Sequence, residues 1–201
     1  MTFSKRLTDF LGALALIVFL SPIILLTALF VLILDGRPIF YISERMKSTN
    51  LGFQLVKFRT MKSKEGDSGV SGGDKSDRIT RTGPFLRRSR LDELPQLWNV
   101  IRGDMSFIGP RPPLRQYVER FPEIYNEVLR SRPGVSGLAS IYFHTHEERL
   151  LSRSRDRAET DRIYCRACIP RKARLDLIYQ KNRGLCMDFS LMFKTVFKKL
   201  R

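Results

Sequence analysis

The chain has 201 residues, among them 36 Lys and Arg but only 20 Asp and Glu, giving a formal net charge of +16 at pH 7. This length suits one catalytic domain with an appendage, and the charge requires an anionic partner such as phosphate groups, nucleic acid or an acidic lipid surface. Three cysteines, Cys165, Cys168 and Cys186, are too few for a disulfide framework and favour a reducing compartment.

Near the N-terminus, residues 10–34 contain no charged side chain, and a helix of that length can cross a hydrocarbon layer of ~30 Å. Such a segment argues against a nucleic-acid binder. Ser21-Pro22 lies near its middle, where proline predicts a kink or a break. Basic residues flank it on both sides: Lys5 and Arg6 before, and Arg37, Arg45 and Lys47 after. A re-entrant helix keeps both clusters on the cytoplasmic face, whereas a kinked span separates them, and residue patterns alone leave both open.

The next segments predict a small sheet and a loop. Residues 38–42 and 52–61 are rich in aromatic and branched side chains, which suits two short strands. Residues 62–77 have no large hydrophobic side chain except Val70, which is typical of a mobile loop. This loop is either a lid over a site or a passive linker.

Helices are predicted for much of the remaining chain. Apolar residues recur at helical spacing over residues 94–102, with Gly103 as a stop, and a second helix is expected over 114–130. The final segment, residues 187–201, is amphipathic and lies either on an anionic bilayer surface or against the core. The expected fold is α/β, with a small sheet and surrounding helices.

A charged cluster lies between residues 57 and 111. Its basic members are Lys57, Arg59, Arg87 and Arg111, and the Asp92-Glu93 pair lies among them. Cations neutralise phosphate oxygens, while a carboxylate attacks phosphorus or binds a divalent metal. Helix N–H groups would keep two carboxylates ionised at a helix start. The alternative, which the residue pattern by itself favours, is that Asp92 only caps the following helix.

The stretch FLRRSRLDELPQLWNVIRGDMSFIGPRP, residues 85–112, closely resembles the core of the bacterial sugar transferases, the small monotopic phosphoglycosyl transferases. KFRTM, RITRTG and RPGVSGLA, at residues 57–61, 78–83 and 132–139, are also similar to the family's motifs. The resemblance covers nearly the whole chain. It implies a re-entrant membrane helix over residues 1–36, broken at Ser-Pro, and a catalytic domain over residues 37–201. The location it implies is the cytoplasmic face of a bacterial inner membrane, with anionic lipids as partners and no nucleic acid.

The resemblance also implies a reaction. Asp92 is expected to attack the β-phosphate of a UDP-sugar and expel UMP, after which polyprenyl (undecaprenyl) phosphate attacks the aspartyl sugar phosphate. Glu93 is expected to bind Mg²⁺, while Arg87, Arg111, Lys57 and Arg59 bind phosphate groups. This would be the first membrane step of glycan assembly.

Several residues depart from the family's pattern. The family often continues GLAQVNGR where this chain has GLASIYFHTH, so Ser140 and His144 replace a Gln and an Arg. Residues 144–174 are interpreted as a substrate-facing elaboration. His144, His146, Cys165 and Cys168 fit no familiar zinc spacing and are not predicted to bind metal. The rival function is a catalytically silent, basic membrane-surface scaffold.

Overall fold

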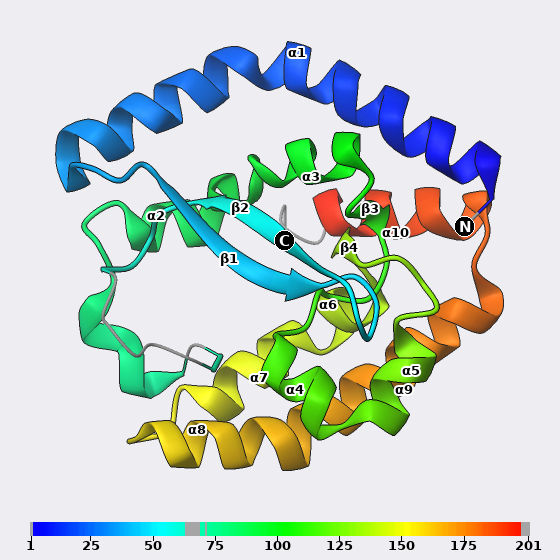
Figure 1. Ribbon diagram of the computed structural model, residues 1–201. Coiled ribbons are helices and arrows are strands. Elements are labelled where there is room, and N and C mark those ends of the chain that lie inside the picture. Colours follow the sequence, from blue (N-terminus) through cyan, green and yellow to red (C-terminus); the bar gives the residue numbers. More distant parts are fainter. Residues whose placement is uncertain (1, 63–68, 71, 198–201) are drawn as a thin grey trace.

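The computed structural model describes residues 2–62, 69–70 and 72–197. Its strands are β1 (Phe40–Met46), β2 (Gly52–Phe58), β3 (Ser106–Ile108) and β4 (Gly134–Ser136). β1 and β2 form an antiparallel hairpin, and β3 and β4 form a parallel pair. Helices surround both pairs (Figure 1), so the predicted α/β fold with a small sheet is confirmed.

Helices make up most of the chain, and their bounds are as follows. The α-helices are α1 (Phe3–Asp35), α2 (Gly83–Ser89), α3 (Gln96–Arg102), α4 (Arg115–Arg120), α5 (Pro122–Val128), α6 (Leu138–Tyr142), α7 (His144–Leu151), α8 (Arg157–Ile163), α9 (Ile169–Asn182) and α10 (Leu185–Phe197). Two 3₁₀-helices, η1 (Gly73–Arg78) and η2 (Leu91–Glu93), and a π-helical segment, η3 (Tyr164–Cys168), complete the set within the described residues.

The N-terminal helix α1 arcs over the rest of the molecule (Figure 1). It is continuous, although Pro22 lies inside it. Proline cannot donate to the carbonyl four residues earlier, and here the Ser21 hydroxyl donates to that carbonyl, of Val18, at 2.8 Å. The helix expected to be broken at Ser21-Pro22 is therefore bent but not interrupted.

The N-terminal end of α1 is bonded to the domain that follows it. The Lys5 ammonium pairs with the Asp188 carboxylate of α10 at 2.5 Å. Arg6 donates to the carbonyls of Val100 and Ile101 at the end of α3, at 2.6 Å each. The Val100 carbonyl also accepts from the N–H of Gly103 at 3.0 Å, and the two Arg6 bonds fix the position of α1 against the end of α3.

The C-terminal end of α1 is bonded to the same domain. Arg59 Nη2 donates to the carbonyls of Asp35 and Gly36, at 2.5 and 2.9 Å. The Thr82 hydroxyl donates to the Asp35 carboxylate. Both ends of the apolar helix therefore contact one body, formed by residues beyond 36.

The two faces of α1 differ in burial. Ala13 and Val31 are fully buried against the domain, whereas Phe19 and Leu25 on the outer side are 79% and 70% exposed. Among the described residues, α1 is the one helix long and apolar enough to cross a membrane by length and composition. Its outer face is too apolar to be stable in water and needs an apolar partner.

Most of the predicted elements are found, with one correction. The helix expected over residues 114–130 is two helices, α4 and α5, which meet at Phe121 with φ −129° and ψ 58°. The ring of Pro122 clashes with a helical residue before it, so the chain leaves the helix at Phe121 and starts again. The helix expected at 94–102 begins at Gln96.

Part of the segment predicted as a loop over residues 62–77 forms the helix η1. Residues 63–68 and 71 lie outside the described residues, whereas η1 packs against α8. Thr160 donates to Asp74 at 2.8 Å, and a Cβ on Gly73 would lie 2.5 Å from the backbone oxygens of Ser152 and Ser154. Glycine is needed at residue 73 for this close approach.

Helix α10 confirms the core-packing alternative for the C-terminal segment, and contact of its other face with a bilayer stays a prediction. Leu191 is buried in the core, whereas Phe189, Phe193 and Phe197 are 47%, 63% and 57% exposed. One face of this helix therefore packs against the domain and the other presents aromatic side chains, as interfacial helices do. Residues 198–201 lie outside the described residues.

Candidate active site

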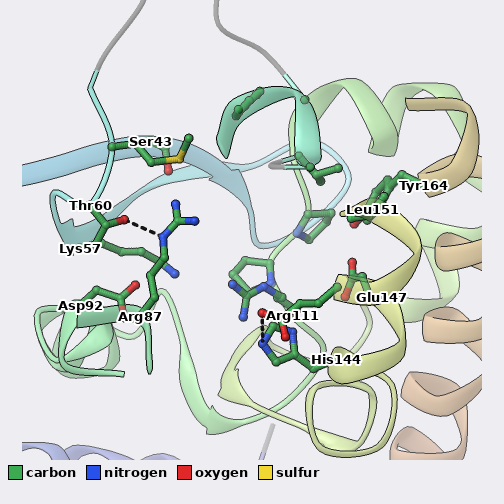
Figure 2. Close-up of a pocket in the computed structure, with 18 of the residues that line it drawn as sticks. Ser43, Lys57, Thr60, Arg87, Asp92, Arg111, His144, Glu147, Leu151 and Tyr164 are labelled. Atoms are coloured by element: carbon green, nitrogen blue, oxygen red, sulfur yellow. Dashed lines mark hydrogen bonds and ion pairs between the residues drawn. The ribbon is translucent and has the colours of Figure 1, made fainter. Parts of the chain in front are cut away.

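A cavity of about 810 Å³ lies between the β1–β2 hairpin, the η2 turn and helices α7 and α9. Lys57, Arg87, Asp92, Glu93 and Arg111 all line it. In Figure 2, Asp92, Lys57 and Arg87 lie on one side, Glu147 and Tyr164 on the other, and Arg111 between them. The structure thus brings five of the six predicted site residues together.

The sixth, Arg59, does not line the cavity. Its guanidinium binds the carbonyls at the end of α1, as described above. The predicted phosphate contact from Arg59 is therefore replaced by a structural role. Sequence reasoning grouped it with Lys57 because both flank Phe58, but after β2 ends the chain directs the two cations to different partners.

The Asp92-Glu93 pair lies in η2, not in the first turn of α3. Arg90 adopts a left-handed conformation, with φ 61° and ψ 14°, and this sharp turn between α2 and η2 presents the two carboxyls to the cavity. The N-cap of α3 is Pro95, and no side chain caps that helix. The interpretation of Asp92 as a helix cap is therefore wrong.

Asp92 is buried but unbonded. It is 8% exposed, and its Oδ1 has no hydrogen-bond partner among the described residues. Burial raises the pKa of the Asp92 carboxyl; Lys57 opposes this rise and Glu93 adds to it. The expectation that helix N–H groups hold Asp92 ionised is wrong, because no such group donates to it. A desolvated carboxylate without a partner is a reactive group.

Glu93 has the opposite environment. Its Oε1 lies 2.8 Å from Lys57 Nζ and 3.5 Å from Arg111 Nη2, and Arg90 Nη1 lies 3.6 Å away. Burial alone would raise the pKa of Glu93, but these cations outweigh it and hold the pKa well below its usual range. The cations, not a helix N-terminus, keep this carboxylate ionised.

Arg87 has donors available for a ligand. Its Nε donates to the Thr60 hydroxyl at 3.1 Å, and its other nitrogens make no hydrogen bond to the residues that the structure describes. That bond holds the Arg87 guanidinium beside Asp92, and the two charged groups interact electrostatically. A planar guanidinium in this position can bind two oxygens of one phosphate group.

Helices α7 and α9 supply cavity residues that were not predicted one by one. Lys172 Nζ lies 2.8 Å from a Glu147 oxygen and 3.3 Å from the Tyr164 hydroxyl. Asp176 is 6% exposed, and its Oδ1 is unpartnered within the described part of the chain. Burial raises the pKa of Asp176 to about 7, against the opposing charge of Lys172.

These residues include members of the 144–174 stretch that was interpreted as substrate-facing, and the stretch does line the cavity. The π-helical segment η3 joins α8 to α9 and carries Tyr164, consistent with the frequent use of π-segments at functional sites. The sequence carries the signal IPRK-RLD-IY here, but helical spacing alone does not tell which of its charged residues faces inward.

Among the described residues, no group of three or more His, Cys, Asp and Glu side chains is placed to hold a metal ion. His144, His146, Cys165 and Cys168 are not gathered into such a group there. Mg²⁺ has different needs, because it is commonly bound by one or two carboxylates together with substrate phosphates. The unpartnered oxygen of Asp92 and the ionised Glu93 fit an ion shared with a diphosphate.

Fold and cleft together define a class of protein. One bent helix has an exposed apolar face, and the domain bonded to its two ends has a cation-lined cleft with a carboxylate pair that suits an anionic ligand. The model of the family described as bacterial sugar transferase matches residues 1–201, and the chain belongs to that family.

Individual relatives carry more specific names. The chain is 34% identical over 200 residues to the UDP-N-acetylgalactosamine-undecaprenyl-phosphate N-acetylgalactosaminephosphotransferase of Aeromonas hydrophila, covering 96% of this chain and 43% of that protein. It is 31% identical to the UDP-glucose:undecaprenyl-phosphate glucose-1-phosphate transferase of Klebsiella pneumoniae, covering 96% and 39%. The exopolysaccharide production protein ExoY of Sinorhizobium fredii is 34% identical, covering 96% and 84%. The chain thus spans less than half the length of the first two relatives.

The buried Asp176 predicts a specific pH dependence of stability. Its folded pKa of about 7 lies above the ordinary value of 3.8, so the folded state binds the proton more tightly. The free energy of unfolding should therefore fall as pH rises from about 4 to 7 and stay low above that. Asp176→Asn should remove this fall and stabilise the ligand-free protein at pH 8 by roughly 1–3 kcal/mol. This gain is smaller than the pKa shift alone would give, because the buried amide still lacks a partner.

Thermal unfolding of the detergent-solubilised protein at pH 4.5 and pH 8 measures this effect. Asp161→Asn is the matched control, since Asp161 pairs with Arg120 at 2.7 Å and does not line the cavity. If the difference in stability between the wild type and Asp176→Asn were the same at pH 8 as at pH 4.5, the prediction would be contradicted.

Proposed function

We propose that this chain is a UDP-sugar-dependent polyprenyl-phosphate sugar-1-phosphate transferase acting in the first membrane step of glycan assembly. The observation that carries the proposal is the buried, unpartnered Oδ1 of Asp92 in a cleft lined by cations. The names of the Aeromonas and Klebsiella relatives, which specify UDP-sugars and undecaprenyl phosphate, support the two substrates.

The proposed reaction proceeds in two displacements at one phosphorus. A carboxylate oxygen of Asp92 attacks the β-phosphorus, a new O–P bond forms, and the bond from that phosphorus to the bridging oxygen breaks. UMP leaves with the electron pair, and the sugar phosphate remains on Asp92. An oxygen of polyprenyl phosphate then attacks the same phosphorus and releases the carboxylate. Asp92 ends as it began, so no external oxidant or acid is consumed.

The cations have separate roles in this proposal. Arg87 lies beside Asp92 and binds the phosphate under attack, while Lys57 and Arg111, both bonded to Glu93, face the same cleft. They neutralise charge that develops on the leaving UMP. Glu93 is the residue that would hold Mg²⁺, and the ion would supply further charge neutralisation.

We also propose that α1 is re-entrant and that the domain rests on the cytoplasmic face of the inner membrane. Lys5 at one end of α1 and Asp35 at the other are both bonded to the domain. A straight span would separate these ends by a hydrocarbon layer of ~30 Å. The exposed aromatic side chains of α10 extend the apolar face beside α1, and the basic surface suits anionic lipids.

The topology has a direct test in intact bacterial cells. Cys186 is exposed on the domain, whereas Cys165 and Cys168 are buried, so a membrane-impermeant maleimide reports one native position. Ser4→Cys in a Cys186→Ser background reports the start of α1. We expect both thiols to be protected in intact cells and labelled after the inner membrane is permeabilised. Labelling of residue 4 alone in intact cells would show a spanning helix.

The role of Asp92 is tested by Asp92→Asn, which preserves shape but removes the nucleophile. We expect a folded protein whose UMP release falls at least 10³-fold. Wild-type protein mixed with a UDP-sugar and Mg²⁺, without polyprenyl phosphate, should gain the mass of a sugar phosphate on the peptide that contains Asp92. Asp161→Asn, outside the cleft, is the control. An Asp92→Asn protein with near-normal turnover would overturn the assignment of Asp92 as the nucleophile, whereas a wild-type protein that releases no UMP would favour the catalytically silent scaffold.

Metal dependence is tested separately. Removing divalent ions with EDTA should abolish UMP release, and Mg²⁺ or Mn²⁺ should restore it. Glu93→Gln should raise the Mg²⁺ concentration needed for half-maximal rate at least tenfold and lower the maximal rate, because an amide is a poorer ligand than a carboxylate. Full turnover in excess EDTA would rule out the proposed ion.

A further inference from the structure

The cavity extends beyond the Asp92-Glu93 pair into a second region between α5, α7 and α9. Asp176 lies there at 6% exposure with Oδ1 unpartnered, and Arg45 of β1 has a buried Nε with no partner among the described residues. Arg45 lies near Tyr164, whose hydroxyl also accepts from Lys172. The region thus combines an unsatisfied acceptor with an unsatisfied donor.

Unsatisfied buried groups are costly, and a native protein retains them where a ligand completes them. A ligand that satisfies Asp176 must donate a hydrogen bond, and one that satisfies Arg45 must accept one. A hydroxyl group does both. A phosphate group only accepts at neutral pH, and it would be repelled by Asp176 and Glu147.

Charge distinguishes the two directions in which a UDP-sugar can extend from Asp92. Apart from the dyad, the acidic residues that line the cavity all come from α7 and α9: Glu147, Glu148 and Asp176. Among the described residues of the 62–78 segment, the charged side chains that line the cavity are the cations Lys62, Lys75 and Arg78. The α-phosphate, which is anionic, is favoured near those cations. The sugar, which is bonded to the other side of the β-phosphate, then extends toward α9.

We infer that Asp176, with Arg45 and the Glu147–Lys172 ion pair around it, forms the sugar-reading subsite, in which ring hydroxyls complete the unpaired groups. This inference rests on the proposed function and adds the residues that select the sugar. The relatives' names specify N-acetylgalactosamine and glucose, so relatives of this chain differ in the sugars that their names give. A site built to bond a hydroxyl rejects an analogue that lacks it much more strongly than an apolar pocket does.

Asp176→Asn is the decisive variant, and it is expected to fold because it relieves a buried carboxyl. The assay measures UMP release with undecaprenyl phosphate and four donors: UDP-glucose, UDP-galactose and their two N-acetylamino counterparts. For the preferred donor, kcat/KM should fall at least tenfold, and the preference between epimers should shrink by a similar factor. Calorimetry should show affinity for UDP, which lacks the sugar, changed less than threefold. Arg45→Gln should act in the same direction.

The alternatives give different results. If Asp176 acted only through its charge, the neutral Asn would tighten both UDP and the UDP-sugars. If it bound the uracil ring, UDP and the UDP-sugars would lose affinity equally. Either result overturns the inference. It is also overturned if the Asp176→Asn variant selects among the four donors as the Asp161→Asn control does. Should the wild type release no UMP from any donor, the proposed function fails, and the binding difference between UDP-sugar and UDP still tests the subsite.

Discussion

The pairing of Lys57 with Glu93 is the interaction on which the cleft depends. Because Glu93 pairs with Lys57 and also approaches Arg111, Asp92 one residue earlier is left buried, with its Oδ1 unpartnered among the described residues. Two adjacent carboxyls thereby acquire opposite properties from their surroundings: one has a lowered pKa and the other a raised one. Two carboxyls with opposite pKa shifts suit a reaction that needs both a nucleophile and a metal-binding or orienting group.

The geometry of this pairing is set by Asn99 in α3. Its side chain donates to the carbonyl of Gln54 at 2.7 Å and accepts from the N–H of Val56 at 3.1 Å, which fastens the helix to the edge of β2. Asn99 is 1% exposed, so water does not compete for these bonds. The η2 turn, directly before α3, is thereby held opposite Lys57.

Residues 57–60 join the membrane helix to the cleft. Lys57 reaches Glu93, Phe58 packs with Val31 of α1, Arg59 binds the end of α1, and Thr60 orients Arg87. Any displacement of α1 relative to the domain therefore acts on a segment that also positions two cations of the site. Helix α1 and the site are parts of one structure, and under the proposed function a polyprenyl phosphate held in the bilayer would meet the cleft at a fixed depth.

Much of this arrangement could be predicted from sequence, for physical reasons that differ by element. The apolar run of α1, the two strands and α3 follow from hydrophobic periodicity, and the cluster of Asp92, Glu93 and Arg87 follows from motif and charge. The role of Arg59 could not be predicted, because its partners are carbonyls at the end of α1, and they come within reach only once α1 has packed against the end of β2. Asp176 could not be singled out either, since its burial depends on α5, α7 and α9 meeting across long sequence separations.

Asp92 and Asp176 are both buried carboxyls with one oxygen that has no partner within the described residues. Each is buried by rigid elements and each has a raised pKa, so each lowers the stability of the free protein. In the proposed reaction a ligand provides what each lacks: phosphorus for Asp92 and hydroxyl donors for Asp176. Because Arg111 feels the charge of Glu93 on one side and of Glu147 on the other, it links the two regions. A sugar phosphate seated at Arg111 would therefore meet both carboxyls at once, which couples the choice of sugar to the chemistry at phosphorus.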